Sequence, residues 1–152
     1  MRVNAMIRRM QFTDLDKVSQ IWLESNKEAH GFISAEYWES HLQSVKTALL
    51  QAEVYVYVNE RRDEILGFIG MNGEYIEGIF IDGRARSLGI GRELLDFVKV
   101  KKDRLKLHVY VKNERAVRFY KREGFRVIRT LIDDGTGEEE YIMIYGPAGS
   151  AV

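Results

Sequence analysis

The sequence predicts an α/β (α+β) fold, in which a mixed, mostly antiparallel central sheet of about seven strands carries helices on both faces. Strand-like alternation and helical periodicity interleave along the chain in the order β-α-α-β-β-β-α-β-α-β-β. The chain has 152 residues, 45% of them apolar and 30% charged, so it can bury one core without disulfides or metal. We expect a single domain over residues 1–146 and a flexible tail over residues 147–152.

The first third of the chain is expected to form a short strand and two helices. Residues 6–8 are the strand candidate. Thr13 stands before acidic residues and is the expected N-cap of a helix that continues to about Ala29. Ser34 is the expected cap of a second helix, whose apolar face carries Tyr37, Trp38, Leu42, Val45 and Leu49.

Three strands are expected next, over residues 54–58, 65–71 and 75–81. These segments are rich in β-branched and aromatic residues, which favour strands. Asn72-Gly73, between the last two segments, is the strongest hairpin signal in the chain. We therefore expect the three strands to form an antiparallel meander.

The last third of the chain alternates between helices and strands. The elements are expected at residues 91–102 (helix), 105–111 (strand), 114–123 (helix), 125–131 and 140–144 (strands). Gly124 is the expected left-handed stop of the helix before it. The final two strands are expected to pair around the glycine-containing turn at residues 134–137 and to close the sheet.

Charge and cysteine content exclude several classes of function. The chain has 23 basic and 23 acidic residues, and a net charge of zero gives no reason to expect nucleic acid or an anionic membrane as a partner. Without cysteine there is no disulfide, no thiolate metal site and no cysteine-linked acetyl intermediate. The sequence has no apolar stretch long enough to span a bilayer and no signal-peptide pattern, so we expect a cytoplasmic protein without a metal.

A glycine-containing loop enters the helix at residues 91–102. Gly89 and Gly91 allow successive backbone N–H groups to converge, and the helix N-terminus adds a positive partial charge. Such a place binds a pyrophosphate, and the nearby side chains of Arg84, Arg86 and Arg92 would neutralise further charge. The alternative is a glycine-assisted turn on a solvated basic loop. A P-loop is excluded because Arg92-Glu93 stands where Lys-Ser/Thr is needed, and a Rossmann fingerprint because the position for its third small residue holds Leu94.

A second motif begins at Asn113, after the strand at residues 105–111. Tyr120 follows Asn113 by about two helical turns, and Gly124-Phe125 ends the segment. A tyrosine there can present its hydroxyl to a reacting centre. Alone, it is more simply a core aromatic, as we expect for Phe119 and Phe125.

Taken together, the two motifs resemble the GNAT superfamily of acetyl-CoA-dependent N-acetyltransferases. Arg86, Gly89 and Gly91 match the first family motif, Gln/Arg-x-x-Gly-x-Gly/Ala, which follows the fourth strand. Asn113, Tyr120 and the Gly124-Phe125 ending match the second motif, which follows the fifth strand. The element order fits over nearly the whole chain. Residues 30–33 and Tyr37-Trp38 further resemble a bacterial subgroup of small acetyltransferases.

The resemblance implies how acetyl-CoA would bind as co-substrate. In this family the fourth and fifth strands splay apart, and the pantetheine enters the gap. Backbone groups of Ile79, Phe80 and Ile81 would pair with the pantetheine. The pyrophosphate would be held by backbone N–H groups of Arg86, Ser87, Leu88, Gly89, Ile90, Gly91 and Arg92. Asn113 would bind the cofactor, Tyr120 would protonate the departing thiolate, and a primary amine would attack directly within a ternary complex.

The general base is left open between two residues. Attack requires a neutral amine, so a base is useful at neutral pH. By strand period, Glu77 is expected to share a face with Tyr75, Ile79 and Ile81. His108, on the next strand, has a side chain with a pKa suited to the task and is slightly preferred. Either residue could instead be structural, Glu77 as a solvated carboxylate and His108 as a buried histidine.

The acceptor pocket is expected from the first two helices and the loop between the last strands. Its candidate residues are His30, Phe32, Tyr37, Trp38 and Tyr75, which could equally be core residues or a dimer contact. The acidic residues at 133–134 and 138–140 could attract a cationic lysine or polyamine, or form a solvated turn. The acceptor, a protein lysine, an N-terminus or a small-molecule amine, stays open, as does the choice between monomer and homodimer. The alternative functions are a non-catalytic acyl-CoA sensor and an interaction protein.

Overall fold

A computed structural model describes residues 5–147 of the chain. Its strands are β1 (Ala5–Arg9), β2 (Glu53–Asn59), β3 (Glu64–Asn72), β4 (Tyr75–Ile81), β5 (Leu105–Tyr110), β6 (Arg126–Ile132) and β7 (Glu139–Tyr145). Its α-helices are α1 (Leu15–Ala29), α2 (Ala35–Ser40), α3 (Leu42–Gln51), α4 (Ile90–Lys101) and α5 (Glu114–Arg122), with short 3-10 turns at Phe12–Asp14 and Gly83–Ala85. Most of the tail expected at residues 147–152 lies outside the described residues. Within residues 5–147, no helix combines the length and the apolar character needed to cross a membrane.

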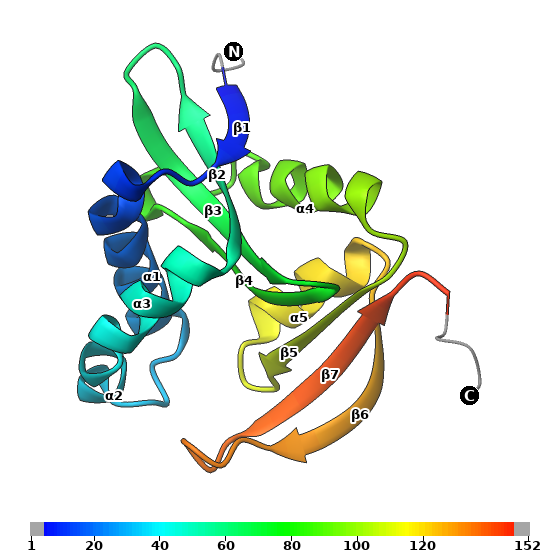
Figure 1. The fold of residues 1–152 in the computed structure, drawn as a ribbon. Helices are drawn as coiled ribbons and strands as arrows, with labels where there is room; N and C mark the ends of the chain where they lie inside the picture. The colour runs from blue at the N-terminus through cyan, green and yellow to red at the C-terminus, as the bar shows by residue number, and fades with distance from the viewer. Residues whose placement is uncertain (1–4, 148–152) are drawn as a thin grey trace.

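The strands form one seven-stranded sheet in the order β1-β2-β3-β4-β5-β7-β6. Every neighbouring pair is antiparallel except β4 and β5, which are parallel. The mixed, mostly antiparallel sheet predicted from the sequence is therefore confirmed. Helices α1–α3 lie on one side of the sheet and α4 and α5 on the other (Figure 1). Gly124 has φ +96°, so the expected left-handed stop after α5 is confirmed as well.

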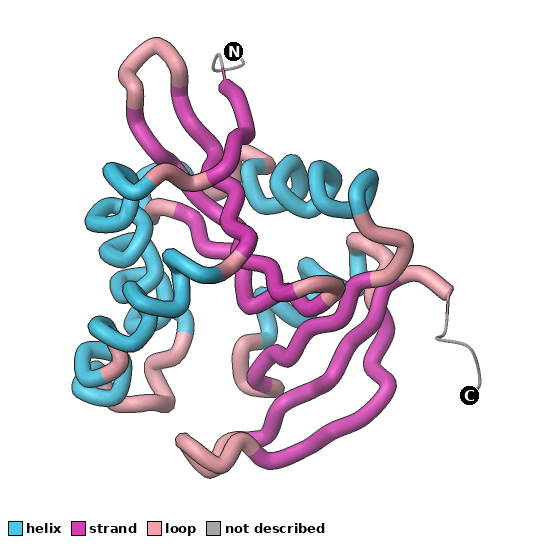
Figure 2. Tube along the Cα trace, viewed as in Figure 1, coloured by secondary structure: helices cyan, strands magenta, loops and turns pink. Residues whose placement is uncertain are grey.

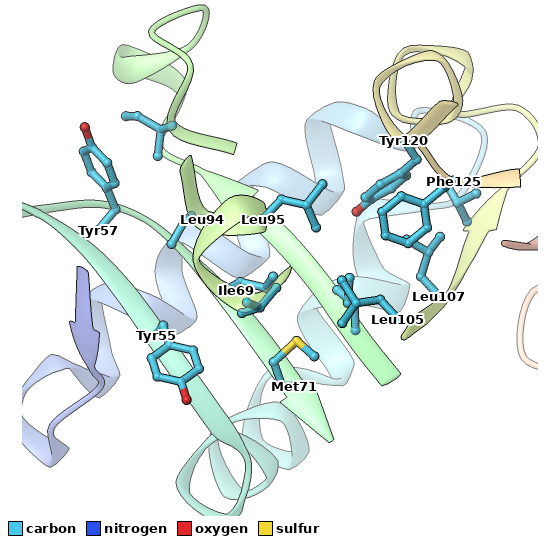
Figure 3. Packing of buried hydrophobic residues seen from close by; sticks show 14 of the residues in the cluster. Tyr55, Tyr57, Ile69, Met71, Leu94, Leu95, Leu105, Leu107, Tyr120 and Phe125 are labelled. Atoms are coloured by element: carbon cyan, nitrogen blue, oxygen red, sulfur yellow. The ribbon is translucent and has the colours of Figure 1, made fainter. Parts of the chain in front are cut away.

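Two hydrophobic clusters hold these layers together. The larger lies between the sheet and α4–α5, where Leu94, Leu95 and Val98 pack against residues such as Leu105 and Leu107 (Figure 3). The smaller lies between α1, α3 and the strands β2 and β3. The second cluster does not reach β5, β6 or β7, so α1–α3 leave part of this face uncovered, although His30 and Phe32, which follow α1, contact Tyr110 of β5. Most of β6 is solvent exposed, and β6 and β7 form the outer end of the sheet (Figure 2).

The start of the first helix differs from the prediction. Asp14, not Thr13, organises it: the Asp14 carboxylate accepts a hydrogen bond from the Gln11 backbone N–H at 2.7 Å, within a capping box. Arg8 donates two further hydrogen bonds to Asp14, at 2.7 and 3.2 Å. Burial acts to raise the pKa of Asp14, but these bonds bring it below its ordinary value. The prediction of Thr13 as N-cap was wrong because Asp14 bonds both the strand and the turn before the helix.

The second predicted helix is two helices, α2 and α3, which meet at His41. Ser34 caps α2 as expected, accepting a hydrogen bond from the Tyr37 N–H. At the break, Ser40 Oγ donates to the Tyr37 carbonyl at 2.8 Å, and His41 Nδ1 lies 2.6 Å from the same oxygen. These side chains compete for a carbonyl that a continuous helix would use, so the chain turns there.

The β4–β5 junction positions the functional site. The two strands pair only at Tyr75–Lys106 and Ile76–Leu107, and separate beyond these positions. In β4 a bulge at Glu77 shifts the register against β3, since Gly70 pairs with Gly78 but Met71 pairs with Ile76.

The bulge overturns one prediction about faces. Ile79 and Ile81 pack with the α4–α5 cluster. Glu77 instead lies on the opposite face, because its Cβ is 3.7 Å from the position that a Cβ on Gly70 would occupy, and Gly70 alternates with Ile69 and Met71 of that cluster. Glu77 therefore does not share a face with Ile79 and Ile81.

Candidate active site

The loop between β4 and α4 exposes backbone groups at the N-terminus of α4, the expected anion site. Ser87 and Gly89 both adopt left-handed conformations, with φ +64° and +79°. Gly89 is the N-cap of α4 and has no neighbouring atom within 4 Å of where its Cβ would stand. In the described part of the chain no side chain caps this helix end, so the amides of Ile90, Gly91 and Arg92 are available to a ligand.

The arginines of the loop are engaged in ion pairs. Arg86 contacts Glu28 of α1 at 2.7 Å. Arg84 contacts Asp82 and Glu64 at 3.1 and 2.7 Å, and its hydrogen bonds hold the pKa of Asp82 far below its usual range. Arg92 lies 3.9 Å from both Asp96 and Glu123. Arg84 and Arg86 are therefore less available to an anion than the backbone amides are, and Arg92 has the loosest ion pairs of the three arginines.

Gly91 lies beside this expected anion site. A Cβ at Gly91 would stand 3.5 Å from the ring of Phe119 in α5 and 4.0 Å from Ile79 in β4. These are ordinary van der Waals distances, so the first turn of α4 lies close to α5 and to the splayed part of β4, and a methyl group would still fit between them.

Tyr120 lies on the inner face of α5. Its ring centroid is 5.3 Å from that of Phe119 and 5.4 Å from that of Phe125, and it points toward the core beside Leu107 of β5 (Figure 3). Burial, reinforced by nearby Tyr75, raises the pKa of the Tyr120 hydroxyl well above its ordinary value. The hydroxyl therefore keeps its proton at neutral pH, as a proton donor must.

Asn113 connects this region to the opposite side of the sheet. Its Oδ1 accepts a hydrogen bond from the Ala116 N–H at 3.3 Å and caps α5. Its Nδ2 donates to His30 Nε2 at 3.1 Å. Because the amide nitrogen can only donate, His30 Nε2 must accept, which assigns the proton of the neutral ring to Nδ1.

His30 lies in a buried aromatic cluster between α1 and α2. Its ring stacks on Trp38 at 5.3 Å and meets the edges of Phe32 and Tyr110 at 5.6 and 5.1 Å. Burial lowers the pKa of His30 to about 4, against a weaker opposing effect of the Asn26 backbone. His30 is thus neutral at pH 7. Its role in the expected acceptor pocket stays a prediction.

His108 and Glu77, the two candidate bases, lie on the same face of the sheet. His108 Nδ1 is 3.7 Å from Glu140 Oε1, and the Tyr75 ring meets the His108 ring edge-on at 5.4 Å. Burial, with the charges of Lys106 and Arg129, lowers the pKa of His108, while Asp133 opposes that shift. Partial desolvation raises the pKa of Glu77 although its side chain is exposed. Tyr75 lies close to Glu77, and burial and that carboxylate raise its pKa to about 12.

The β6–β7 loop approaches α2 from the other side. A Cβ on Gly135 would stand 3.0 Å from the Tyr37 hydroxyl. Asp133 accepts hydrogen bonds from Tyr110 and Thr136, each at 2.8 Å. Sequence reasoning missed Tyr110 and gave Glu140 no specific role. Both could have been found, since Tyr110 is two positions after His108 on β5, and Glu140 of β7 pairs with Tyr110.

The strands β4 and β5 separate beside the uncapped N-terminus of α4. This arrangement is typical of enzymes that bind acyl-CoA between two splayed strands. A family model described as an acetyltransferase (GNAT) domain matches residues 15–135. The chain belongs to this family, and it is an acetyl-CoA-dependent N-acetyltransferase.

Similar proteins agree with this assignment. The chain is 34% identical over 139 residues to the Escherichia coli peptidyl-lysine N-acetyltransferase YiaC, covering 91% of this chain and 94% of that protein. It is 36% identical over 129 residues to E. coli peptidyl-lysine N-acetyltransferase YjaB, covering 84% and 87%. The solution structure of apo YjaB superposes with a TM-score of 0.83 over 95% of this chain and 99% of that chain. A PaiA N-acetyltransferase from Thermoplasma acidophilum, solved with coenzyme A, shares the fold at 20% identity, with a TM-score of 0.76 over 95% of this chain and 99% of that chain.

Proposed function

We propose that this enzyme acetylates the side-chain amine of lysine residues in polypeptides. The observation that carries the proposal is the part of the sheet face that α1–α3 leave uncovered, over β6 and the adjoining residues Lys106 of β5 and Ile144 of β7. An open face accepts a side chain presented on a polypeptide, whereas an enclosed pocket would favour a small amine. The two E. coli relatives are peptidyl-lysine acetyltransferases, which supports the same choice.

The donor would bind along the opening between β4 and β5. We assign the pyrophosphate to the backbone N–H groups of residues 86–92, with Gly89 at the centre. Backbone groups of residues 79–81 would pair with the pantetheine. Asn113 would hold the N-terminus of α5 in place. The hydrogen-bonding positions of its amide that the protein does not use would bind the cofactor. Bound acetyl-CoA supplies the activated acetyl group, as a co-substrate rather than a resident cofactor.

The transfer would be direct, within a ternary complex. The carboxylates of Glu140 and Asp133 attract the lysine ammonium into the open face. His108 or Glu77 removes a proton from the amine, either directly or through a water molecule. The neutral amine then attacks the acetyl carbon, and the C–S bond breaks as Tyr120 donates its proton to the leaving sulfur. The proton that the amide nitrogen loses replaces, through solvent, the one that Tyr120 gave up. No step requires a cysteine, and the chain has none.

Calorimetric titration with acetyl-CoA, followed by a turnover assay, tests the proposal. We expect saturable binding, and at a hundredfold excess over Kd an increase of about 2.7 kcal/mol in unfolding free energy. Acetylation of lysine peptides, read by mass spectrometry, should exceed that of polyamines and other small amines. Absence of binding overturns the donor assignment, while binding without turnover of any amine favours the non-catalytic sensor. A cytoplasmic location, the lack of nucleic-acid or membrane partners, and a monomer or homodimer stay predictions.

A further inference from the structure

A groove adjoins the expected reaction centre on the open face of the sheet. It has a volume of about 450 Å³ and lies between the β3–β4 turn and the strands β5, β6 and β7. Tyr75 and Lys106 line one part, Ile128 and Ile144 form an apolar wall, and Arg104 and Glu74 stand at its edge. Its mixture of apolar wall and cationic groups is suited to an acidic side chain with its methylene carbons.

The groove is continuous with the face that carries His108. Lys106, His108 and Tyr110 alternate on β5 with Leu105, Leu107 and Val109, which are buried in the α4–α5 cluster. Tyr75 lines the groove and also contacts the His108 ring at 5.4 Å. Lys106 and His108 are two strand positions apart, or about 7 Å. A substrate at His108 would therefore have its neighbouring residues beside Lys106.

Charge is divided along this face. Arg104 is already paired with Glu74 at 3.1 Å. Among residues 5–147, neither Lys106 nor Arg129 has a carboxylate within ion-pairing distance. Arg129 stands opposite Ile142, which stands opposite His108, so all three lie on this face. Both cations lower the pKa of His108, whereas Asp133, on the other side, raises it. The face therefore changes from basic to acidic across His108.

We propose that the groove binds an aspartate or glutamate side chain of the polypeptide substrate, about two residues from the lysine that is acetylated. Lys106 is the specificity-determining residue of this subsite. The inference rests on the proposed lysine acetylation. An extended peptide advances about 7 Å in two residues, which matches the separation of Lys106 from His108 along β5. The ammonium of the target lysine then lies toward Asp133 and Glu140, and the acidic neighbour lies toward Lys106.

The experiment compares peptides of identical length that differ two positions from a single central lysine. Glutamate, glutamine or arginine occupies that position, on the N-terminal side in one series and on the C-terminal side in the other. For the unmodified enzyme we expect the glutamate peptide in one series to have a KM about fivefold below that of the arginine peptide, with kcat within about twofold. Lys106→Glu should reverse this order, and Lys106→Gln should remove it.

Arg62→Glu is the matched control, because it makes the same charge change at an exposed position. Arg62 lies in the turn between β2 and β3, on the other half of the sheet from β6. This variant should keep the peptide preference of the unmodified enzyme, and all variants should keep its affinity for acetyl-CoA. Equal KM values for all peptides, or the same preference in Lys106→Glu, overturn the subsite and leave lysine acetylation standing. Failure to acetylate every peptide overturns both.

Discussion

The two sides of the sheet support one reaction by different structural means. On the α4–α5 side, the proposed donor site depends on backbone geometry, namely left-handed Gly89 and the uncapped amides after it. On the α1–α3 side, the acceptor site depends on side chains from the α1–α2 connection, β4, β5 and the β6–β7 hairpin. The donor is the same for the whole family, so one local motif can bind it. The residues that recognise the acceptor come from several distant segments and can differ from one family member to another.

The largest expected effect is on the donor side, at Tyr120. Tyr120→Phe keeps the ring between Phe119 and Phe125 and removes only the hydroxyl. If that hydroxyl protonates the thiolate, kcat should fall on the order of 1,000-fold while the Kd for acetyl-CoA stays within a few-fold. Steady-state kinetics and calorimetry measure both quantities. Tyr145→Phe, whose ring also packs on Phe125 at 5.5 Å, is the control and should be nearly silent. A loss below about tenfold in Tyr120→Phe contradicts the assignment.

The next effect is on the acceptor side and concerns the general base. Burial lowers the pKa of His108 below its ordinary value and raises the pKa of Glu77 above its ordinary value, so the acid limbs expected for the two residues lie closer together than those of the free side chains. Because the two shifts bring the values closer together, substitution separates the residues better than the profile of the unmodified enzyme does. We expect His108→Gln to abolish the limb and to lower kcat about 100-fold, and Glu77→Gln to keep the limb. The opposite result makes Glu77 the base. A limb that survives both changes rules out base catalysis by these residues.

A smaller effect on the donor side tests the expected anion site. Gly89→Glu places a carboxylate at the expected pyrophosphate site, which should weaken acetyl-CoA binding by about 2 kcal/mol, or roughly 30-fold in Kd. Gly73→Glu is a closely matched control. Gly73 also has a positive φ, +63°, and open space around its Cβ position, but it lies in the β3–β4 turn. Gly73→Glu should cause similar backbone strain to Gly89→Glu and leave the Kd for acetyl-CoA unchanged. Equal losses in the two variants would mean that strain, not the anion site, explains the result.

The smallest effect concerns stability and the link between the two sides at His30. Its folded pKa of about 4 lies below its ordinary 6.5, so the unfolded chain binds more protons between these values and stability falls as pH decreases through them. Between pH 7 and pH 5 the unmodified protein should lose roughly 1–2 kcal/mol more unfolding free energy than His30→Gln, which cannot titrate. Urea denaturation at both pH values measures the difference. Equal losses would show that His30 titrates normally in the folded protein.

The sequence predicted the donor side better than the acceptor side, for a physical reason. The turn at Gly89 and the left-handed stop at Gly124 are local requirements of the chain, visible in the residues themselves. The face of Glu77 was wrong because it depends on a bulge, which is set by the register of β4 against β3. The break at His41 depends on side chains that compete for one carbonyl.

The acceptor side involves pairings across long sequence separations. His30 and Asn113 are 83 positions apart, and no local pattern indicates their hydrogen bond. Residues 30–33 and Tyr37-Trp38 pointed to a subgroup of acetyltransferases, and the structure adds that His30 is buried, neutral and bonded to the helix that carries Tyr120.

The short β4–β5 pairing has a consequence for the local stability of the enzyme. With only two paired positions between them, the two halves of the sheet share a weak seam, and local opening should begin there. Acetyl-CoA bound between β4 and β5 would bridge the two strands and stabilise this part of the sheet. Resistance to proteases should then be higher with bound acetyl-CoA than without it, which limited proteolysis in the presence and absence of the donor would measure.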